Sequence, residues 1–241
     1  MTDSSPALGT KDGSRKTEPA KTLSHSWPGL AAFDMDGTLI QGRLVFALSE
    51  ALGNADKVMA IQASSIPGYE KTKAIASLFA DLSRKDIESA VESIPLVKNS
   101  EAVIRQLREQ GCKVGIISDS YTIALQSVAA RLGGMDFITA NYLEFRQGKT
   151  TGAVRMPLGW EKIGCFCKIS VCKRYHLEKY SRQFGIPVRN TLAVGDTMSD
   201  ACMVAAAGVG VAFMPKDSKI AKATKNVVEQ PDLAKVLEFR F

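Results

Sequence analysis

The amino-acid sequence predicts an α/β fold, in which a parallel β-sheet carries helices on both faces and a small helical cap is inserted after the first strand. Short apolar runs of strand length alternate with amphipathic helix patterns, as in a parallel sheet covered by helices. The 241 residues are 45% hydrophobic and 23% charged, which is enough apolar material for a sizeable core. The stretch between the first two strand runs is too long for a simple crossover and predicts the cap.

Four apolar runs are predicted as sheet strands: residues 30–33, 114–117, 191–194 and 209–213. Residues 137–154 differ, because spaced apolar and aromatic residues lead into the turn at Gln147, Gly148 and Lys149. That pattern is typical of a β-hairpin.

Amphipathic patterns predict the helices. In residues 101–110, Val103, Ile104 and Leu107 share one face, Ser100 is expected to cap the start and Gly111 to end the helix. Patterns at 44–52, 70–79 and 85–91 fall inside the long insertion. We therefore divide the chain into a catalytic core (28–41 and 97–241), a helical cap (42–96) and a disordered Ser-, Thr-, Lys- and Pro-rich tail (1–27).

Composition excludes several classes of protein. The longest apolar run, residues 204–214, falls well short of the roughly 20 residues that a membrane span needs. The first 26 residues lack the pattern of a secretory signal, so we expect a cytoplasmic protein. Five cysteines, an odd number in a chain this long, do not describe a disulfide framework.

The charge balance indicates an anionic partner without identifying it. The chain has 31 basic and 25 acidic residues, a net charge of +6, and residues 155–182 carry seven Lys or Arg against two Glu. This excess can attract a small phosphorylated metabolite as readily as nucleic acid. Because no aromatic residues interleave with a basic face, nucleic-acid binding is not favoured. The oligomeric state has no signal in the sequence.

The first chemical motif is the pair Asp34 and Asp36, followed by Gly37 and Thr38, directly after the first apolar strand. On an extended backbone the i, i+2 spacing aims both carboxylates out of the carboxyl end of the strand. Ligands bind at that edge of open parallel sheets. The alternative is an Asx-rich turn that only ends the strand.

Two later strands end in similar chemistry. Ser118 follows the strand at 114–117 and is expected just before a helix. Its hydroxyl and the N–H groups of the helix start would suit a phosphate. The alternative is that the serine only caps the helix. Asp196 and Asp200 follow Gly195 after the strand at 191–194. Two acids at one sheet edge repel each other unless a cation such as Mg²⁺ lies between them. The alternative is a helix cap at Asp196 with Asp200 in solvent.

The chain resembles the haloacid dehalogenase superfamily of phosphotransfer enzymes in four motifs that follow one another in the same order. They are D-x-D-G-T at 34–38, a serine at a strand end (Ser118), a lysine, and G-D-x-x-x-D at 195–200. The resemblance covers about residues 30–239 and implies a Rossmann-like core. The phosphoserine phosphatase branch is the most similar, in the position of the helical insertion, in the hairpin sequence at 140–152 and in residues 205–213 and 231–233.

The resemblance implies a mechanism. Asp34 would be the nucleophile that forms an aspartyl-phosphate, and Asp36 the general acid and then the base. Mg²⁺ would bind the Asp34 carboxylate, the Asp36 main-chain carbonyl and Asp196, with Asp200 as a ligand or as a residue that orients the others. Lys173 matches the spacing of the family lysine to Asp196.

The remaining site residues follow from the same resemblance. Lys168 is the second candidate for the family lysine. Ser118 would hold a phosphoryl oxygen, which is the interaction expected of a substrate-binding residue. The predicted substrate-binding residues are Gly37, Thr38, Arg43, Ser118 and Asp119.

Two departures from the branch concern the substrate. Arg43 stands where the branch has a cap glutamate that holds the serine ammonium, and a guanidinium prefers a carboxylate, a sulfate or a second phosphate. Asp119 and Ser120 follow Ser118 where the branch tends to have glycines. In the cap, Lys71 and Lys73 either replace a family arginine or lie on a solvated helix face.

These observations predict a Mg²⁺-dependent hydrolase of a small phosphomonoester, with phosphoserine as the first substrate to test. The alternatives are another sugar or organic-acid phosphate, phosphoryl transfer to an alcohol, and a phospholigand-binding scaffold without catalysis. The scaffold would be expected to lack Asp34 or Asp36, and both are present.

Cys165, Cys167 and Cys172, followed by His176, invite a zinc interpretation. The Cys-x-Cys pair is tighter than the usual Cys-x₂₋₄-Cys pair and no second pair follows. We therefore favour free or core cysteines.

Overall fold

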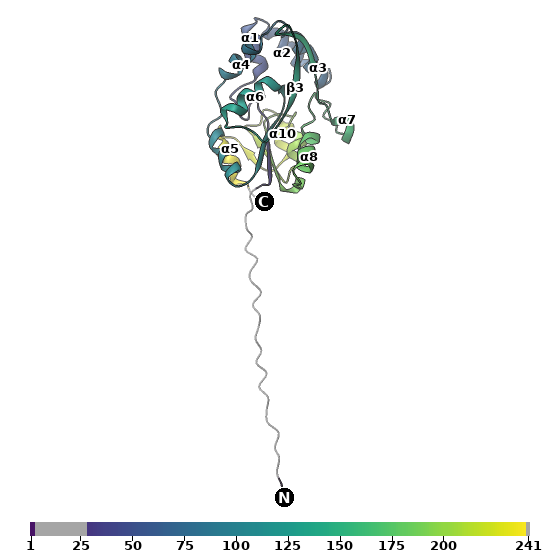
Figure 1. The fold of residues 1–241 in the computed structure, drawn as a ribbon. Helices are drawn as coiled ribbons and strands as arrows, with labels where there is room; N and C mark the ends of the chain where they lie inside the picture. Colours follow the sequence, from purple (N-terminus) through teal and green to yellow (C-terminus); the bar gives the residue numbers. More distant parts are fainter. Residues whose placement is uncertain (3–27, 240–241) are drawn as a thin grey trace.

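The computed structural model describes residues 1–2 and 28–239 and has a seven-stranded sheet in the order β4-β3-β2-β1-β5-β6-β7 (Figure 1). The β3–β4 pair is antiparallel, and the other neighbouring strands are parallel. This arrangement confirms the predicted α/β class. The strands are β1 (Leu30–Phe33), β2 (Lys113–Tyr121), β3 (Phe137–Arg146), β4 (Lys149–Arg155), β5 (Thr191–Gly195), β6 (Val209–Phe213) and β7 (Val227–Val228).

The helices lie between the strands in sequence. Five of them fall between β1 and β2, and four of these five lie within residues 42–96, where the cap is expected. One of these four, α2, was not predicted, because Val58 is its only buried residue and its apolar face is weak. The helices are α1 (Leu44–Ala51), α2 (Ala55–Ala63), α3 (Gly68–Ser77), α4 (Arg84–Glu92), α5 (Ser100–Glu109), α6 (Thr122–Arg131), α7 (Trp160–Ile163), α8 (Lys173–Gln183), α9 (Ala201–Ala206) and α10 (Ser218–Ala223).

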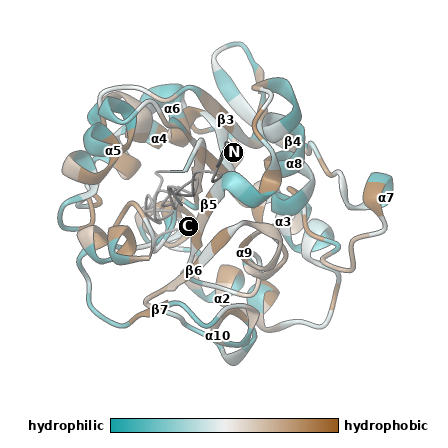
Figure 2. Ribbon diagram, turned by 90° about the horizontal axis from the view of Figure 1, so that it is seen from below, coloured by the Kyte–Doolittle hydropathy of each residue, from teal (hydrophilic) through white to brown (hydrophobic). Residues whose placement is uncertain are grey.

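The central strand β1 is buried on both faces. Ala31 and Phe33 pack into the core cluster that includes residues of α5 and α6, whereas Leu30 and Ala32 pack into the cluster that includes residues of α8 and α9. In the view from below, the central strands of the sheet lie among the helices that surround them (Figure 2). This alternation explains why the strand sequence is continuously apolar.

Helix α5 begins in a different way from the one predicted. Asn99 precedes it with φ 65° and no side chain caps it, whereas Ser100 is buried and its hydroxyl donates to the Leu39 carbonyl at 3.4 Å. The predicted Ser100 cap is therefore wrong, because the packing of the helix start against residue 39 takes the serine side chain inward. Gly111, at φ 79°, follows the helix end as expected.

The β3–β4 hairpin confirms the predicted turn at Gln147 and Gly148, and it reaches the inserted helices. Thr150 on β4 is buried, and its hydroxyl donates to the Phe79 carbonyl at 2.6 Å. Its main-chain N–H donates to the Leu82 carbonyl at 2.8 Å. The division into core and cap at residues 42–96 stays a prediction, but the hairpin ties the two segments together.

The predicted tail, residues 1–27, lies outside the described residues apart from its first two. None of the helices in the described part of the chain has both the length and the apolar character needed to span a bilayer.

Candidate active site

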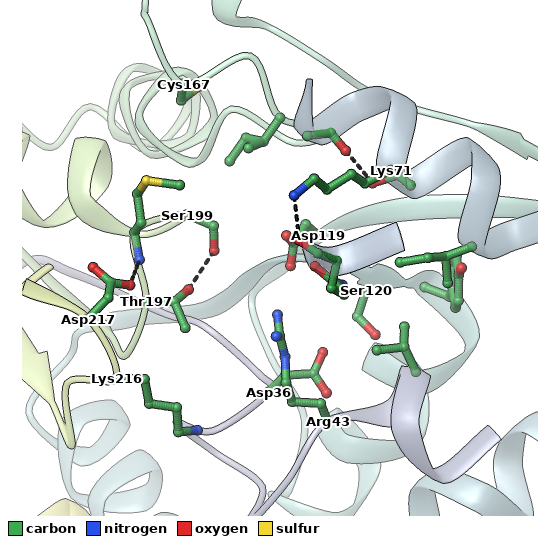
Figure 3. Close-up of a pocket in the computed structure, with 18 of the residues that line it drawn as sticks. Asp36, Arg43, Lys71, Asp119, Ser120, Cys167, Thr197, Ser199, Lys216 and Asp217 are labelled. Carbon is green, nitrogen blue, oxygen red and sulfur yellow. Dashed lines mark hydrogen bonds between the residues drawn. The ribbon is translucent and has the colours of Figure 1, made fainter. Parts of the chain in front are cut away.

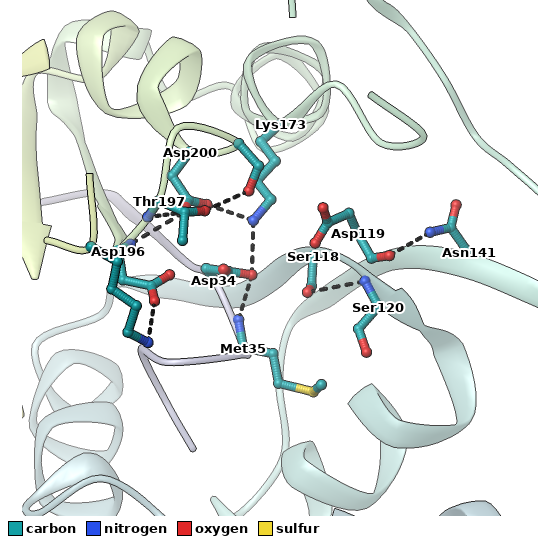
Figure 4. Close-up of polar contacts among 12 residues, drawn as sticks. Asp34, Met35, Ser118, Asp119, Ser120, Asn141, Lys173, Asp196, Thr197 and Asp200 are labelled. Carbon is teal, nitrogen blue, oxygen red and sulfur yellow. Dashed lines mark hydrogen bonds and ion pairs between the residues drawn. The ribbon is translucent and has the colours of Figure 1, made fainter. Parts of the chain in front are cut away.

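Three neighbouring parallel strands bring the polar motifs to one edge of the sheet. Phe33, the last residue of β1, is in register with Ile116 of β2 and Val194 of β5. The residues that follow these positions, including Asp34 and Asp196, therefore meet at the carboxyl edge (Figure 4). This is the edge at which open α/β sheets bind ligands.

Lys173 joins two of the predicted acids. It is the first residue of α8, its side chain is fully buried, and its Nζ lies 2.8 Å from Asp34 Oδ1 and 2.5 Å from Asp200 Oδ1 (Figure 4). Burial lowers the pKa of Lys173, but the charges of Asp200 and Asp34 outweigh it and hold this pKa well above its ordinary value. A permanent cation therefore stands beside the Asp34 carboxylate.

Asp34 and Asp36 are both buried and both titrate near neutrality. Asp34 Oδ1 also accepts from the Met35 N–H at 2.7 Å, and burial, followed by the charge of Asp200, raises the pKa of Asp34 to about 7. Asp36 Oδ1 accepts from the Leu44 N–H at 2.8 Å, and burial and the charge of Asp34 raise the pKa of Asp36 to about 7. A carboxyl group with such a pKa can both give and take a proton.

Asp200 holds the loop after β5 in place. It is fully buried, and its Oδ2 accepts from the main-chain N–H groups of Asp196 at 3.2 Å and Thr197 at 3.0 Å. The alternative of a capping Asp196 with a solvated Asp200 is therefore wrong. Because both oxygens of Asp200 already accept hydrogen bonds, its geometry suits the orienting role better than that of a ligand.

The acids fit a hard divalent cation. One carboxylate oxygen from each of Asp34, Asp196 and Asp200 lies within 4.8 Å of the other two, and all three residues are buried. Asp196 Oδ2 accepts from Lys216 Nζ at 2.8 Å, whereas its buried Oδ1 has no hydrogen-bond partner among the described residues. Burial and the charge of Asp34 raise the pKa of Asp196 to about 6. An oxygen-rich, unsatisfied site of this kind suits Mg²⁺.

Ser118 lies at the same edge but not at a helix start. It is fully buried, and its hydroxyl oxygen accepts from the Ser120 N–H at 3.3 Å, while its own O–H has no acceptor among the described residues. Strand β2 continues to Tyr121, which pairs with Asn141 of β3 beyond a register shift, and α6 begins only at Thr122. The predicted helix start directly after Ser118 is therefore wrong.

Gly37 and Thr38 form the turn after Asp36. Gly37 has φ 81°, and a Cβ there would collide with the Asp196 carboxylate and Lys216 Nζ, so only glycine fits. Thr38 is fully buried, and its Oγ1 has no hydrogen-bond partner in the described part of the chain. Neither residue lines the pocket described next, although both were predicted to bind substrate.

A pocket of about 440 Å³ is lined by Asp36 (Figure 3), whereas the buried Asp34 and Asp196 lie outside its lining. Arg43, which directly precedes α1, points into it on the same side as Asp36. Burial lowers the pKa of Arg43, but the carboxylates of Asp119 and Asp36 outweigh it, so the guanidinium remains charged. The charged residues that line the pocket are Asp36, Arg43, Lys71, Asp119, Lys216 and Asp217.

The two lysines of α3 have different surroundings. Lys71 lines the pocket, and its Nζ donates to the Gln62 carbonyl at 2.6 Å. Lys73 is half exposed and pairs with Glu70 at 3.3 Å on the surface. The solvated-face interpretation therefore holds for Lys73 and is wrong for Lys71.

Lys216 was not identified from the sequence. It follows β6 at the carboxyl edge, between the strand and α10, and it both lines the pocket and contacts Asp196. The signal was available, because residues 209–213 were predicted as a strand and ligand-binding residues follow the carboxyl ends of such strands.

Comparisons with known proteins agree with this geometry. A family model described as haloacid dehalogenase-like hydrolase matches residues 31–205. The chain is 29% identical over 215 residues to the phosphoserine phosphatase of Methanocaldococcus jannaschii, covering 87% of this chain and 96% of the relative. A solved structure described as a phospho-aspartyl intermediate analogue of phosphoserine phosphatase superposes with a TM-score of 0.76 at 27% identity, covering 88% of this chain and 99% of that one.

A further relative is longer than this chain. The phosphoserine phosphatase of Mycobacterium tuberculosis is 31% identical over 191 residues, which cover 78% of this chain and 44% of the relative. This chain therefore spans less than half of that protein.

Proposed function

The chain belongs to the haloacid dehalogenase-like hydrolase family, and from this membership we propose that it hydrolyses a small phosphomonoester through a covalent aspartyl-phosphate. The observation that carries the proposal is the buried Asp34 carboxylate at the end of β1, held 2.8 Å from the fully buried Lys173. Asp36, two residues further on, supplies a second carboxyl group whose pKa is about 7.

The reaction has two steps. In the first, a carboxylate oxygen of Asp34 attacks phosphorus, the bond from phosphorus to the ester oxygen breaks, and Asp36 gives its proton to the leaving alcohol. In the second, Asp36 takes a proton from water, the water oxygen bonds to phosphorus, and inorganic phosphate leaves Asp34. Ser118, through its O–H, and Lys173 stabilise the phosphoryl oxygens in both steps.

Mg²⁺ is the proposed cofactor. The residues that would hold it are Asp34, Asp196 and the main-chain carbonyl of Asp36, and when bound it neutralises phosphoryl charge. Asp200 positions this group by holding both the loop at Asp196 and the ammonium of Lys173.

The proposed substrate carries a carboxylate besides its phosphate. Arg43 and Lys71 line the pocket from different elements of the cap region and suit this second anion. Asp119, whose charge also acts on Arg43, lines the same pocket and suits an ammonium group. Phosphoserine, which the names of the relatives suggest, carries both groups, whereas an organic-acid phosphate carries only the carboxylate.

A substrate series separates these possibilities. We expect phosphate release from phosphoserine to exceed release from phosphoethanolamine, which lacks the carboxylate. Phosphoglycolate has the carboxylate but lacks the ammonium. Faster phosphate release from phosphoserine than from phosphoglycolate would indicate the phosphoserine class, and the reverse would indicate an organic-acid phosphate. Asp34→Asn should reduce turnover by about 10³-fold or more, because the covalent step is lost. Activity of this variant within tenfold of the unmodified protein would contradict the mechanism.

Lys71 and Lys73 provide a matched pair for the carboxylate site. Lys71→Ala should raise KM for carboxylate-bearing substrates by about tenfold, which corresponds to about 1.4 kcal/mol, while Lys73→Ala leaves KM unchanged. Equal effects of the two substitutions would place the substrate carboxylate elsewhere.

Location in the cytoplasm is also proposed. It is supported by the five cysteines, all of which are free thiols in the structure.

A further inference from the structure

Four of the five cysteines meet at one point beside the active site. Cys165 and Cys167 lie in the loop after α7, Cys172 directly precedes α8, and Cys202 is the second residue of α9. Their four sulfur atoms all lie within 4.8 Å of one another. The zinc interpretation considered from the sequence had only three of these ligands, because Cys202 is far from the others along the chain.

We propose that these four sulfurs bind one structural zinc ion. Zinc in such sites is tetrahedral with Zn–S bonds of about 2.3 Å, which places the sulfurs about 3.8 Å apart. Four sulfurs already within 4.8 Å of one another need only small shifts to reach this geometry. Clusters of several irons hold their cysteine sulfurs farther apart, because iron and sulfide lie between them.

The ligand loop is held in shape by the main chain. The Cys165 N–H donates to the Trp160 carbonyl at 3.0 Å, and Gly164, at φ 62°, allows the turn between them. At the other end, the Cys172 N–H donates to the Leu158 carbonyl at 2.9 Å. Three of the four ligands are thus placed by a closed loop before any metal binds.

Cysteine binds metal as the thiolate, so binding of zinc releases the protons of the four thiols.

The site is joined to the catalytic residues by the chain itself. Cys172 immediately precedes Lys173, and Cys202 lies two residues after Asp200. A metal bound to both cysteines fixes the start of α8 against α9 and thereby holds the 2.5 Å contact between Lys173 and Asp200. In this view the four cysteines are positioning residues for the active site.

The test is the metal content of the full chain, expressed with zinc in the medium and passed through gel filtration. We expect about one zinc per chain. Replacement of zinc by Co²⁺ should give the intense sulfur-to-cobalt charge-transfer bands and the visible bands of a tetrahedral tetrathiolate site. Both measurements use the unmodified protein and are independent of phosphatase activity.

Variants identify the ligands. Cys165→Ser combined with Cys167→Ser should lose the zinc and the cobalt bands, and its melting temperature should fall. Cys112→Ser is the matched control, because Cys112 is the one cysteine outside the cluster, and it should keep the full zinc content.

Four outcomes would overturn the proposal. The first is less than one zinc per ten chains together with a cobalt spectrum that lacks these bands, and the second is iron in place of zinc. The third is full zinc content in the double variant. The fourth is a disulfide between two of the four cysteines in the freshly purified protein. Loss of phosphatase activity alone decides nothing here, so failure of the proposed function and failure of the zinc site are distinguishable.

Discussion

Removal of the Lys173 ammonium should affect both stability and catalysis. Lys173→Met keeps most of the side-chain volume but leaves Asp34 and Asp200 buried without the cation that lies 2.8 Å and 2.5 Å from them. Breaking a buried ion pair by removing one partner costs about 3–5 kcal/mol. We expect a loss of that size in the free energy of unfolding, together with a fall in turnover of about 10³-fold or more.

The loss of stability should depend on pH in a defined direction. The pKa of Asp34 is about 7 even with Lys173 present, against 3.8 for an ordinary aspartate, and loss of the lysine raises it further. The unmodified protein shares the fall in stability between 3.8 and about 7, but above about 7 only the folded variant still binds this proton. The stability loss caused by the substitution therefore grows as pH rises above about 7, by up to about 1.4 kcal/mol per pH unit. Urea unfolding in metal-free buffer should therefore show a larger deficit at pH 8 than at pH 5.

A second substitution separates the structural effect from the chemical one. Adding Asp200→Asn to Lys173→Met removes one stranded carboxylate and should recover about 2 kcal/mol of stability without recovering activity. Arg174→Met, next on the same helix, removes a half-exposed cation and should cost less than about 1 kcal/mol. Three results together would refute the reasoning for Lys173→Met. They are a stability loss that does not change with pH, a loss in the free energy of unfolding below about 1 kcal/mol, and activity within tenfold of the unmodified protein.

Three further predictions concern the acid, the metal and a buried histidine. Asp36→Asn should slow hydrolysis of alkyl phosphates far more than that of p-nitrophenyl phosphate, whose leaving group needs little protonation, and equal losses would argue against Asp36 as the acid. EDTA should abolish phosphate release and Mg²⁺ should restore it, whereas Ca²⁺ should inhibit it because the coordination shell of Ca²⁺ is larger and looser. Full activity after exhaustive dialysis against EDTA would remove the metal from the mechanism. Burial lowers the pKa of His176 from 6.5 to about 4. Between these two pH values the folded protein binds fewer protons than the unfolded chain, so the free energy of unfolding should fall by about 2–3 kcal/mol as pH falls from 7 to 4.5. His176→Gln should remove this component, and an unchanged pH slope in urea unfolding would contradict it.

The parts of the fold predicted from the sequence are those whose signal is local. Four sheet strands were predicted because buried parallel strands are continuously apolar, and the hairpin strands because Gly148 allows their turn. The two-residue strand β7 was not predicted, because it is too short to give such a pattern. Two other missed features depend on distant partners. β2 extends past Ser118 because Tyr121 pairs with Asn141 of β3, and Ser100 turns inward because its helix start packs near Leu39.

The same distinction applies to the site. Asp34, Asp36 and Asp196 follow predicted strands directly, so their convergence could be inferred from sheet geometry alone. Lys71 and Lys73 could not be told apart, because both lie on a polar helix and only the packing of α3 near Gln62 directs one of them into the pocket.

The position of α8 and α9 around β5 explains why the proposed zinc site and the catalytic lysine occur together. Helix α8 runs back across the sheet before β5 and α9 follows β5, so both helices begin at the carboxyl edge. This topology brings Lys173 to Asp200 across a gap of 27 residues, and it necessarily brings the adjacent Cys172 near Cys202. A metal at the cysteines and the ion pair at Lys173 and Asp200 thus fix the same two helix starts. Loss of the zinc should therefore weaken catalysis, although the proposed reaction uses none of the four sulfurs.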